Sequence, residues 1–306
     1  MLTGFFMPYT ETYPIQEYLN YLTFQKRYSK NTIISYQNDL TGFFEFIFLE
    51  YKINDVQQIA TPLIRTWLAS LKENKVSSKT INRKISTLKS FFKYQLRIKG
   101  MLVNPASPIS SLKVSRRLPS FIEQKDIQSL LNSDAFGDSF EGKTNFLIFE
   151  ILYQTGIRRS ELIGLKEKHV DKTAGNIKVL GKGNKERIIP VNSNLIKYME
   201  EYILEKRKKF PVYSDDILLV NKKGEKLYPK YIYNVVKINL EQVSTNERKS
   251  PHILRHSFAT HLTNNGAQIN AIKELLGHTS VAATQIYTHN TIEKLKDIYQ
   301  KAHPKS

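Results

Sequence analysis

The sequence lacks the features of a secreted, disulfide-bonded or membrane-spanning protein. None of its 306 residues is a cysteine, which excludes disulfides and thiolate catalysis. No signal peptide is recognisable, and the apolar stretch GFFEFIFLEY is too short to span a bilayer and is interrupted by Glu45. These absences favour a protein of the reducing cytoplasm.

Acidic residues are scarce relative to basic ones. Lys and Arg total 46 against 28 Asp and Glu, a formal charge of +18. The excess runs along the whole chain, because residues 1–105 carry 14 basic and 7 acidic side chains and the rest carries 32 and 21. Positive charge spread over both parts of the chain suits a long polyanionic partner such as nucleic acid better than a small phosphate ligand. An anionic membrane surface is the weaker alternative. Clustered carboxylates that would hold two metal ions are also missing, so we expect neither a metal nor another cofactor.

One break divides the chain. The stretch NPASPISSLKVSRRLPS, residues 104–120, has three prolines, five serines and no helical periodicity. We therefore predict a helical domain over 1–105, a linker over 106–120 and a second domain over 121–306. Apolar residues at helical spacing predict four helices in the first domain, the last of them in SKTINRKISTLKSFFKYQLRIKG.

The second domain has a mixed pattern. EQKDIQSLLNS and TNFLIFEILYQTG are typical of helices, whereas NIKVLGKGNKERIIPV predicts a β-hairpin with a glycine-rich tip. Helices resume afterwards, and HSFATHLTNNG and INAIKELLG are each closed by glycine. The fold class predicted is mainly α, with a small β-hairpin or sheet in the second domain.

Two neighbouring arginines follow a predicted helix end in YQTGIRRSELIGL. Gly156 closes the helix, Arg158 and Arg159 come next, and Glu161 lies three residues after Arg158. An arginine at such a break can turn inward and clamp a phosphate with its planar fork. Composition and spacing alone do not rank Arg158 above Arg159.

The stretch SPHILRHSFATH places His252 and Arg255 on one face of a predicted helix start. A solvated helix end is the ordinary interpretation of such a pair. A zinc site at His252 and His256 is disfavoured, because no carboxylate base lies between them and a cationic Arg255 would lie beside the metal.

The hairpin tip and the C-terminal region add three candidates. Lys182 lies between two glycines, which is ordinary for a soluble turn but also lets a hairpin approach a DNA backbone closely. LLGHTSVAATQIYTH places His278 nine residues before Tyr287. The chain contains 17 tyrosines, and most tyrosines simply pack, so Tyr287 becomes a candidate nucleophile only in combination with the other residues.

Taken in order, these residues resemble the tyrosine recombinase (phage-integrase-like) family, and most closely its Xer branch. The matching text is TGIRRSEL, VLGKGNKERIIPV, HILRHSFATHL, LLGHTSVAATQIYTH and KLKDIYQKAHP, with KRYSKNTIISYQNDLTGFFEF in the first domain. The resemblance covers nearly the whole chain. It identifies Arg158 as the first catalytic arginine, and Arg159 departs from the small apolar residue usual there.

The resemblance implies metal-free transesterification of DNA. Tyr287 would attack a phosphodiester and form a 3′-phosphotyrosyl bond, while Arg158, Arg255 and His278 stabilise the non-bridging oxygens. Lys182 would protonate the leaving 5′-oxygen, and His252 would assist proton transfer from the phenol.

The same resemblance implies a two-domain, C-shaped clamp on double-stranded DNA. In the first domain Lys79, Arg83 and Lys84 would meet the major groove and its phosphates, with a solvated charged face as the alternative, and Arg159 would add a contact. Recombination would proceed through a Holliday junction in a tetramer on two sites, formed with itself or with a paralogue. The amphipathic tail at Ile292, Leu295, Ile298, Tyr299 and Ala302 would dock into a neighbouring protomer, or else pack on its own domain.

The cellular role implied is resolution of chromosome or plasmid dimers near the nucleoid, with a septal DNA translocase as candidate activator. A mobile-element integrase or invertase would use the same chemistry, and a type IB topoisomerase would share it without strand exchange. A non-cleaving architectural DNA-binding protein is the alternative from a different class.

Overall fold

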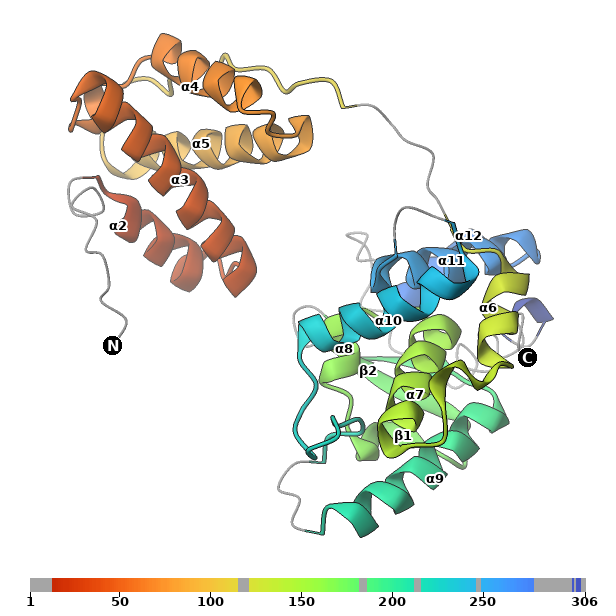
Figure 1. The fold of residues 1–306 in the computed structure, drawn as a ribbon. Coiled ribbons are helices and arrows are strands. Elements are labelled where there is room, and N and C mark those ends of the chain that lie inside the picture. The colour runs from red at the N-terminus through yellow and green to blue at the C-terminus, as the bar shows by residue number, and fades with distance from the viewer. Residues whose placement is uncertain are drawn as a thin grey trace. The chain divides into compact units, whose positions relative to one another are not determined.

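The computed structural model describes residues 13–114, 121–181, 186–211, 216–245, 249–277, 299 and 301–303. The chain divides into two compact units, Met1–Arg117 and Leu118–Ser306 (Figure 1). Most described residues are helical, and one small antiparallel sheet lies in the second unit. The predicted fold class is thereby confirmed. Within the described ranges, no helix has both the length and the apolar character needed to cross a membrane.

The first unit is built from helices around an aromatic core. Its elements are α2 (Ile15–Asn20), the π-helical turn η1 (Tyr21–Gln25), α3 (Lys30–Tyr51), the 3₁₀ turn η2 (Val56–Gln58), α4 (Thr61–Glu73) and α5 (Ser78–Ile98). The long helices begin where serines can cap them, because Ser29 and Ser77 accept the backbone N–H of Thr32 and Thr80. The core contains the chain's single tryptophan, Trp67.

The segment after α5 packs on the first unit. Ala106 and Ile109 are buried in its core. The Asn82 side chain accepts the backbone N–H of Leu112 at 2.7 Å and donates to the Leu112 carbonyl at 2.9 Å. Residues 106–112 of the predicted linker therefore pack on the first unit. The buried side chains of Ala106 and Ile109 and the Asn82–Leu112 hydrogen bonds hold this proline- and serine-rich stretch in place. The domain boundaries at 105 and 120 stay a prediction.

The second unit combines helices with a three-stranded sheet. Its elements are α6 (Gln124–Leu131), η3 (Asp134–Phe136), α7 (Phe140–Thr155), α8 (Arg159–Ile163), η4 (Glu167–His169), β1 (Val170–Asp171), β2 (Asn176–Leu180), β3 (Glu186–Pro190), α9 (Ser193–Lys209), α10 (Pro229–Val243), α11 (Pro251–Asn264) and α12 (Ile269–Leu276). Strands β2 and β3 form the predicted hairpin, in a register that pairs Val179 with Arg187 and Ile177 with Ile189. Strand β1 adds to the β2 edge and was not anticipated.

Helix α7 is the centre of the second unit. It packs against α8, α9, α10 and α11 (Figure 1). All of its residues from Leu147 to Thr155 are buried, because the helix has neighbours on several sides. The end of this buried helix is therefore a rigid platform for the residues that follow it.

The described part of the tail packs on the same unit. Tyr299 and Ala302 are buried in the second unit's core. The Tyr299 hydroxyl donates to Gln154 Oε1 at 3.3 Å, and Asn265 Nδ2 donates to the Ala302 carbonyl at 2.7 Å. The other predicted apolar positions, Ile292, Leu295 and Ile298, lie outside the described residues.

Candidate active site

Arg158 is fixed where α7 gives way to α8. Helix α7 ends at Gly156, whose φ of 59° is left-handed. Arg158 precedes the first residue of α8, and its backbone N–H and its Nη1 donate to the two oxygens of Glu161 at 2.7 Å and 2.9 Å. One carboxylate therefore holds both the main chain and the guanidinium of Arg158. Arg159 is exposed and donates to the Pro229 carbonyl at 3.4 Å, so the structure places the two neighbours in different surroundings.

Arg255 lies beside the same break. It is on the first turns of α11, 9% exposed, and its Nη1 donates to the Gly156 carbonyl at 2.6 Å. Its Nη2 donates to the Leu276 carbonyl at 2.7 Å. His252, three residues earlier on α11, is exposed. The spacing predicted a shared helix face for this pair, and the structure buries one member and exposes the other.

A third arginine, Arg187, completes the cluster and was not singled out from the sequence. It is 4% exposed, and its Nη1 and Nη2 donate to the two oxygens of Glu161 at 3.0 Å and 2.8 Å. The strand pattern held a signal for it. Arg187 alternates with Ile189 on the buried face of β3 and pairs with Val179 on β2. A charged residue on an otherwise apolar strand face requires a buried partner, which here is Glu161.

The three arginines meet at the carboxyl end of α12. Arg187 Nε donates to the Leu275 carbonyl at 2.8 Å, Arg255 Nη2 to the Leu276 carbonyl, and Arg158 Nη2 to the Gly277 carbonyl at 3.4 Å. A helix leaves its last carbonyls without intrahelical donors, and cations there also oppose the helix dipole favourably. Three different guanidinium groups therefore hold three consecutive carbonyls.

Gly277 lets this end close tightly. Its φ of 63° is left-handed, and a Cβ built on it would lie 3.2 Å from Cδ and Nη1 of Arg187. In the sequence the next residue is His278, one of the predicted site residues. The clamp on α12 thus ends one residue before His278.

The charges of the cluster are strongly coupled. Burial alone raises the pKa of Glu161, but hydrogen bonds and charge from Arg187, with further bonds from Arg158, outweigh it and lower this pKa. Burial and the nearby charge of Arg158 lower the pKa of Arg255 to about 10, with Glu161 opposing the shift. Arg255 remains charged at neutral pH.

Half of the predicted catalytic set lies outside the described residues: Lys182, His278 and Tyr287. The described strands Asn176–Leu180 and Glu186–Pro190 flank the hairpin tip that contains Lys182. The structure therefore brings together Arg158 and Arg255, with His252 on the same helix as Arg255, and adds Glu161 and Arg187 to them.

The predicted DNA-contacting residues of the first unit differ in their surroundings. Lys79 is exposed on α5. Arg83 and Lys84 both form ion pairs with the buried carboxylate of Asp39, and Lys84 Nζ does so at 3.0 Å. Thr87 Oγ1 also donates to Asp39, at 2.9 Å. Arg83 and Lys84 thus neutralise a buried acid, a role that their spacing in the sequence did not indicate.

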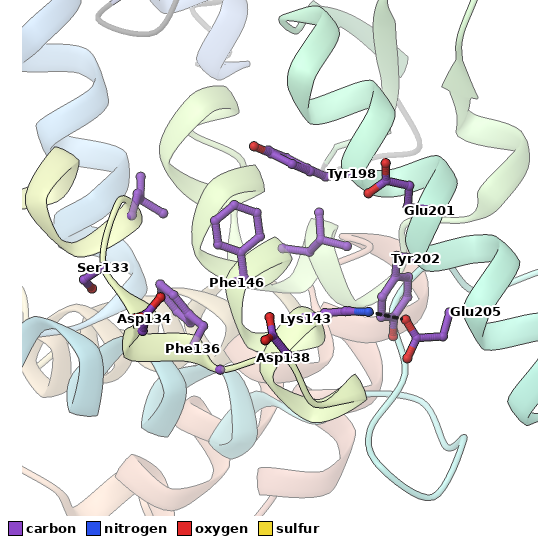
Figure 2. A pocket seen from close by; sticks show the side chains of 13 residues that line it. Ser133, Asp134, Phe136, Asp138, Lys143, Phe146, Tyr198, Glu201, Tyr202 and Glu205 are labelled. Atoms are coloured by element: carbon purple, nitrogen blue, oxygen red, sulfur yellow. Dashed lines mark hydrogen bonds and ion pairs between the residues drawn. The ribbon is translucent and has the colours of Figure 1, made fainter.

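A separate cavity of about 350 Å³ lies between the start of α7 and α9. Phe136, Phe146 and Tyr198 line it, and the Lys143–Glu205 ion pair at 2.6 Å closes one side (Figure 2). None of the predicted site residues within the described ranges lines this cavity. The arginine cluster, rather than this cavity, is therefore the candidate active site.

Comparison with known proteins defines the class. The phage integrase family model matches residues 120–294, and the model of the phage integrase N-terminal SAM-like domain matches residues 15–99. The chain belongs to the phage integrase family, and it is a tyrosine recombinase, an enzyme that cleaves and rejoins DNA in site-specific recombination. The resemblance described from the sequence is thereby confirmed.

Two curated relatives match over nearly their full length, and a solved structure matches over most of its length. The chain is 36% identical to the tyrosine recombinase XerC of Halalkalibacterium halodurans, over 95% of this chain and 97% of the relative. It is 36% identical to the tyrosine recombinase XerD of Staphylococcus saprophyticus, over 95% and 99%. A crystal structure of the XerH site-specific recombinase, bound to palindromic difH substrate in a post-cleavage complex, matches with a TM-score of 0.69 and 26% identity, covering 87% of this chain and 78% of that one.

Proposed function

We propose that this recombinase cleaves DNA through Tyr287. The phenolic oxygen attacks the scissile phosphorus and forms a 3′-phosphotyrosyl bond, while the 5′-oxygen leaves with the electrons of the broken P–O bond. His252 takes the phenol proton and Lys182 gives a proton to the leaving oxygen. The 5′-hydroxyl of a second strand reverses the step, so the bond energy is retained without ATP and strand exchange passes through a Holliday junction.

The observation that carries this proposal is the pairing of Arg158 and Arg255 at the end of α12. Arg158 is held by Glu161, and Arg255 by the carbonyls of Gly156 and Leu276. Both guanidinium groups are charged and fixed before substrate arrives. Preorganised cations of this kind stabilise negative charge that develops on non-bridging phosphate oxygens, and His278 would add a hydrogen bond.

The partner we propose is double-stranded DNA, held in a clamp by both units. Lys79 and Arg159 are exposed and can reach phosphates, whereas Arg83 and Lys84 would contact DNA while still paired with Asp39. The net charge of +18 supports a polyanionic partner along the whole chain. The structurally similar XerH is bound to its difH substrate.

For the cellular role we propose resolution of chromosome or plasmid dimers by a tetramer on two sites. Curated XerC and XerD relatives both match at about the same identity, which supports an Xer role without favouring either paralogue. The protein would act in the cytoplasm at the nucleoid, alone or with a paralogue, and a septal DNA translocase would activate it. A mobile-element integrase or invertase is the other candidate. Sequencing of the genomic DNA that the protein binds and cleaves distinguishes the two. Resolution of dimers predicts one site on the chromosome or plasmid that is resolved, whereas an integrase or invertase predicts sites at the ends of a mobile or invertible segment.

The proposed nucleophile is tested with a suicide substrate, in which the fragment released by cleavage diffuses away. Wild-type protein should leave a covalent protein–DNA band on a denaturing gel, and Tyr287→Phe should leave none while it binds the site as tightly. An adduct formed by Tyr287→Phe would exclude Tyr287 as nucleophile. The absence of any adduct from wild-type protein on its own bound site would favour the non-cleaving alternative.

A further inference from the structure

Arg187 is the one arginine of the cluster to which the proposed mechanism gives no role. It is nearly as inaccessible as a core aliphatic residue, with a side chain 5% exposed, so it does not lie on an open surface where DNA would reach it. A buried guanidinium is costly unless it is fully paired, and Arg187 is paired on both sides. Its two Nη atoms hold Glu161, and its Nε holds the Leu275 carbonyl.

These bonds connect three separate segments of the chain. Arg187 comes from β3, Glu161 from α8, and Leu275 from the last turn of α12. Glu161 in turn fixes the backbone and guanidinium of Arg158. A single side chain therefore joins the support of Arg158 to the helix end that precedes His278.

The planar fork of arginine is required for this arrangement. Nη1 and Nη2 match the two oxygens of Glu161, while Nε points to a third acceptor. A lysine in its place would keep the charge but present one ammonium, which cannot span the carboxylate and the Leu275 carbonyl in the same geometry. Because Gly277 approaches Arg187 closely, the site also leaves little room to rearrange.

We propose that Arg187 is a positioning residue for the cleavage step. It holds Glu161 so that Arg158 faces the scissile phosphate, and it anchors the end of α12. This inference rests on the proposed role of Arg158. Without Arg187, Glu161 turns to other donors, and the Arg158 guanidinium moves away from the phosphate oxygens.

The experiment distinguishes a loss of Arg158 positioning from a general loss of folding by changing the charge of the scissile group in the substrate. A methylphosphonate replaces one non-bridging oxygen by methyl and removes the negative charge, so a well-placed guanidinium matters less. Single-turnover cleavage is measured at saturating protein on matched suicide substrates with an ordinary phosphate or a methylphosphonate. The proteins are wild type, Arg187→Lys, Arg187→Met, Arg158→Ala and a control, Lys206→Met.

Lys206 is the matched control because it is also a buried cation in an ion pair of the second unit. Its Nζ lies 2.6 Å from Glu167 and donates to the carbonyls of Ile217 and Leu218. Lys206→Met should lose stability as Arg187→Met does, but it removes no support from Arg158. All assays are run below the unfolding midpoint of the least stable variant, and circular dichroism checks that each protein is folded.

We expect Arg187→Lys to cleave the phosphate substrate about 100-fold more slowly, the cost of a misplaced catalytic group. On the methylphosphonate, Arg187→Lys and Arg158→Ala should both cleave at rates much closer to that of wild type. The cleavage rate of Lys206→Met relative to wild type should be the same on both substrates. Two results would overturn the positioning role: cleavage by Arg187→Lys at the wild-type rate, or a loss of rate that is the same on both substrates. Wild-type cleavage by Arg158→Ala would instead refute the proposed function.

Discussion

The glycine at the end of α7 provides a test of how closely this site is packed. Gly156 has a left-handed φ of 59°, and a Cβ built on it would lie 2.5 Å from Phe258 Cδ1 and 2.8 Å from Leu276 Cδ2. A left-handed L-residue costs about 1–2 kcal/mol. Overpacking of a filled core adds about 1–3 kcal/mol. Gly156→Ala should therefore lower the free energy of unfolding of the second unit by about 2–5 kcal/mol.

Gly266→Ala is the matched control. Gly266 also has a left-handed φ, of 85°, but nothing lies within 4 Å of the position of its Cβ. This variant should show only the backbone cost, so the difference between the two variants measures the contacts with Phe258 and Leu276. In a unit of this size about 1 kcal/mol corresponds to a shift in Tm of about 2–4 °C.

The assay uses two probes of urea unfolding. Trp67, the only tryptophan, lies in the core of the first unit, so its fluorescence reports that unit. Far-ultraviolet circular dichroism follows both units. Gly156→Ala should shift only the unfolding transition of the second unit, which circular dichroism follows and Trp67 fluorescence does not. Folded Gly156→Ala should also cleave more slowly, because the Gly156 carbonyl accepts Arg255 Nη1. Equal destabilisation by Gly156→Ala and Gly266→Ala would refute the packing argument.

Three further predictions concern the chemistry, the pH dependence and the tail. Lys182→Ala should lose cleavage on ordinary DNA but regain it on a 5′-phosphorothiolate substrate, whose leaving group needs no proton; without that rescue, Lys182 is not the general acid. The pKa of Glu161 is lowered in the folded protein, so its carboxylate stabilises the fold above its unfolded pKa, and this contribution disappears as the pH falls through the folded pKa. Urea titrations should accordingly show the stability gap between wild type and Glu161→Gln narrowing in acid, and a gap independent of pH would contradict this. Truncation after Thr291 should leave binding to one DNA half-site nearly intact but weaken cooperative filling of the second, and gel shifts with unchanged cooperativity would mean that the tail acts only within its own protomer.

Truncation of the tail can affect the stability of its own unit as well as contacts between protomers. Tyr299 and Ala302 are buried in their own unit, so truncation also removes core residues. A full-length variant with Tyr299→Ala keeps the chain length and removes only the buried phenol side chain, whose hydroxyl donates to Gln154. If both proteins lose stability but only truncation loses cooperativity, then other residues of the 292–306 tail, and not the buried Tyr299 ring, carry the contact between protomers.

Sequence periodicity was sufficient for the helices and the hairpin, because their signals are local. Gly156 and Gly277 mark helix ends that the structure has at the same residues. Thr61 shows the limit of such reasoning. A threonine directly before a proline is typical of an N-cap, but here the helix already includes Thr61 and the cap position is Ala60. The Thr61 hydroxyl instead donates to the Pro105 carbonyl, a partner 44 residues away.

The site illustrates the same limit more strongly. Arg158 and Arg255 follow from the motifs, but the bonds that fix them reach across α8, α11 and α12. Spacing along the chain does not specify such contacts. Arg83 and Lys84 are typical of a DNA-facing stripe, and only the fold shows that Asp39 is buried beneath them. For Arg187, the third arginine of the cluster, the sequence held one signal: the strand alternation places it on an otherwise apolar face.

The arginine clamp on α12 has a consequence for the protein without DNA. Among the described residues of the cluster, Arg158 and Arg187 bind the one carboxylate, Glu161, while Arg255 binds backbone carbonyls. The folded site therefore carries an excess of positive charge in partly buried surroundings. Folding has to overcome the mutual repulsion, and an arriving phosphate relieves it. By linkage, whatever relieves that repulsion binds the folded form and stabilises it. DNA is then a folding ligand for the second unit as well as its substrate, and the empty enzyme is the state most easily lost to heat.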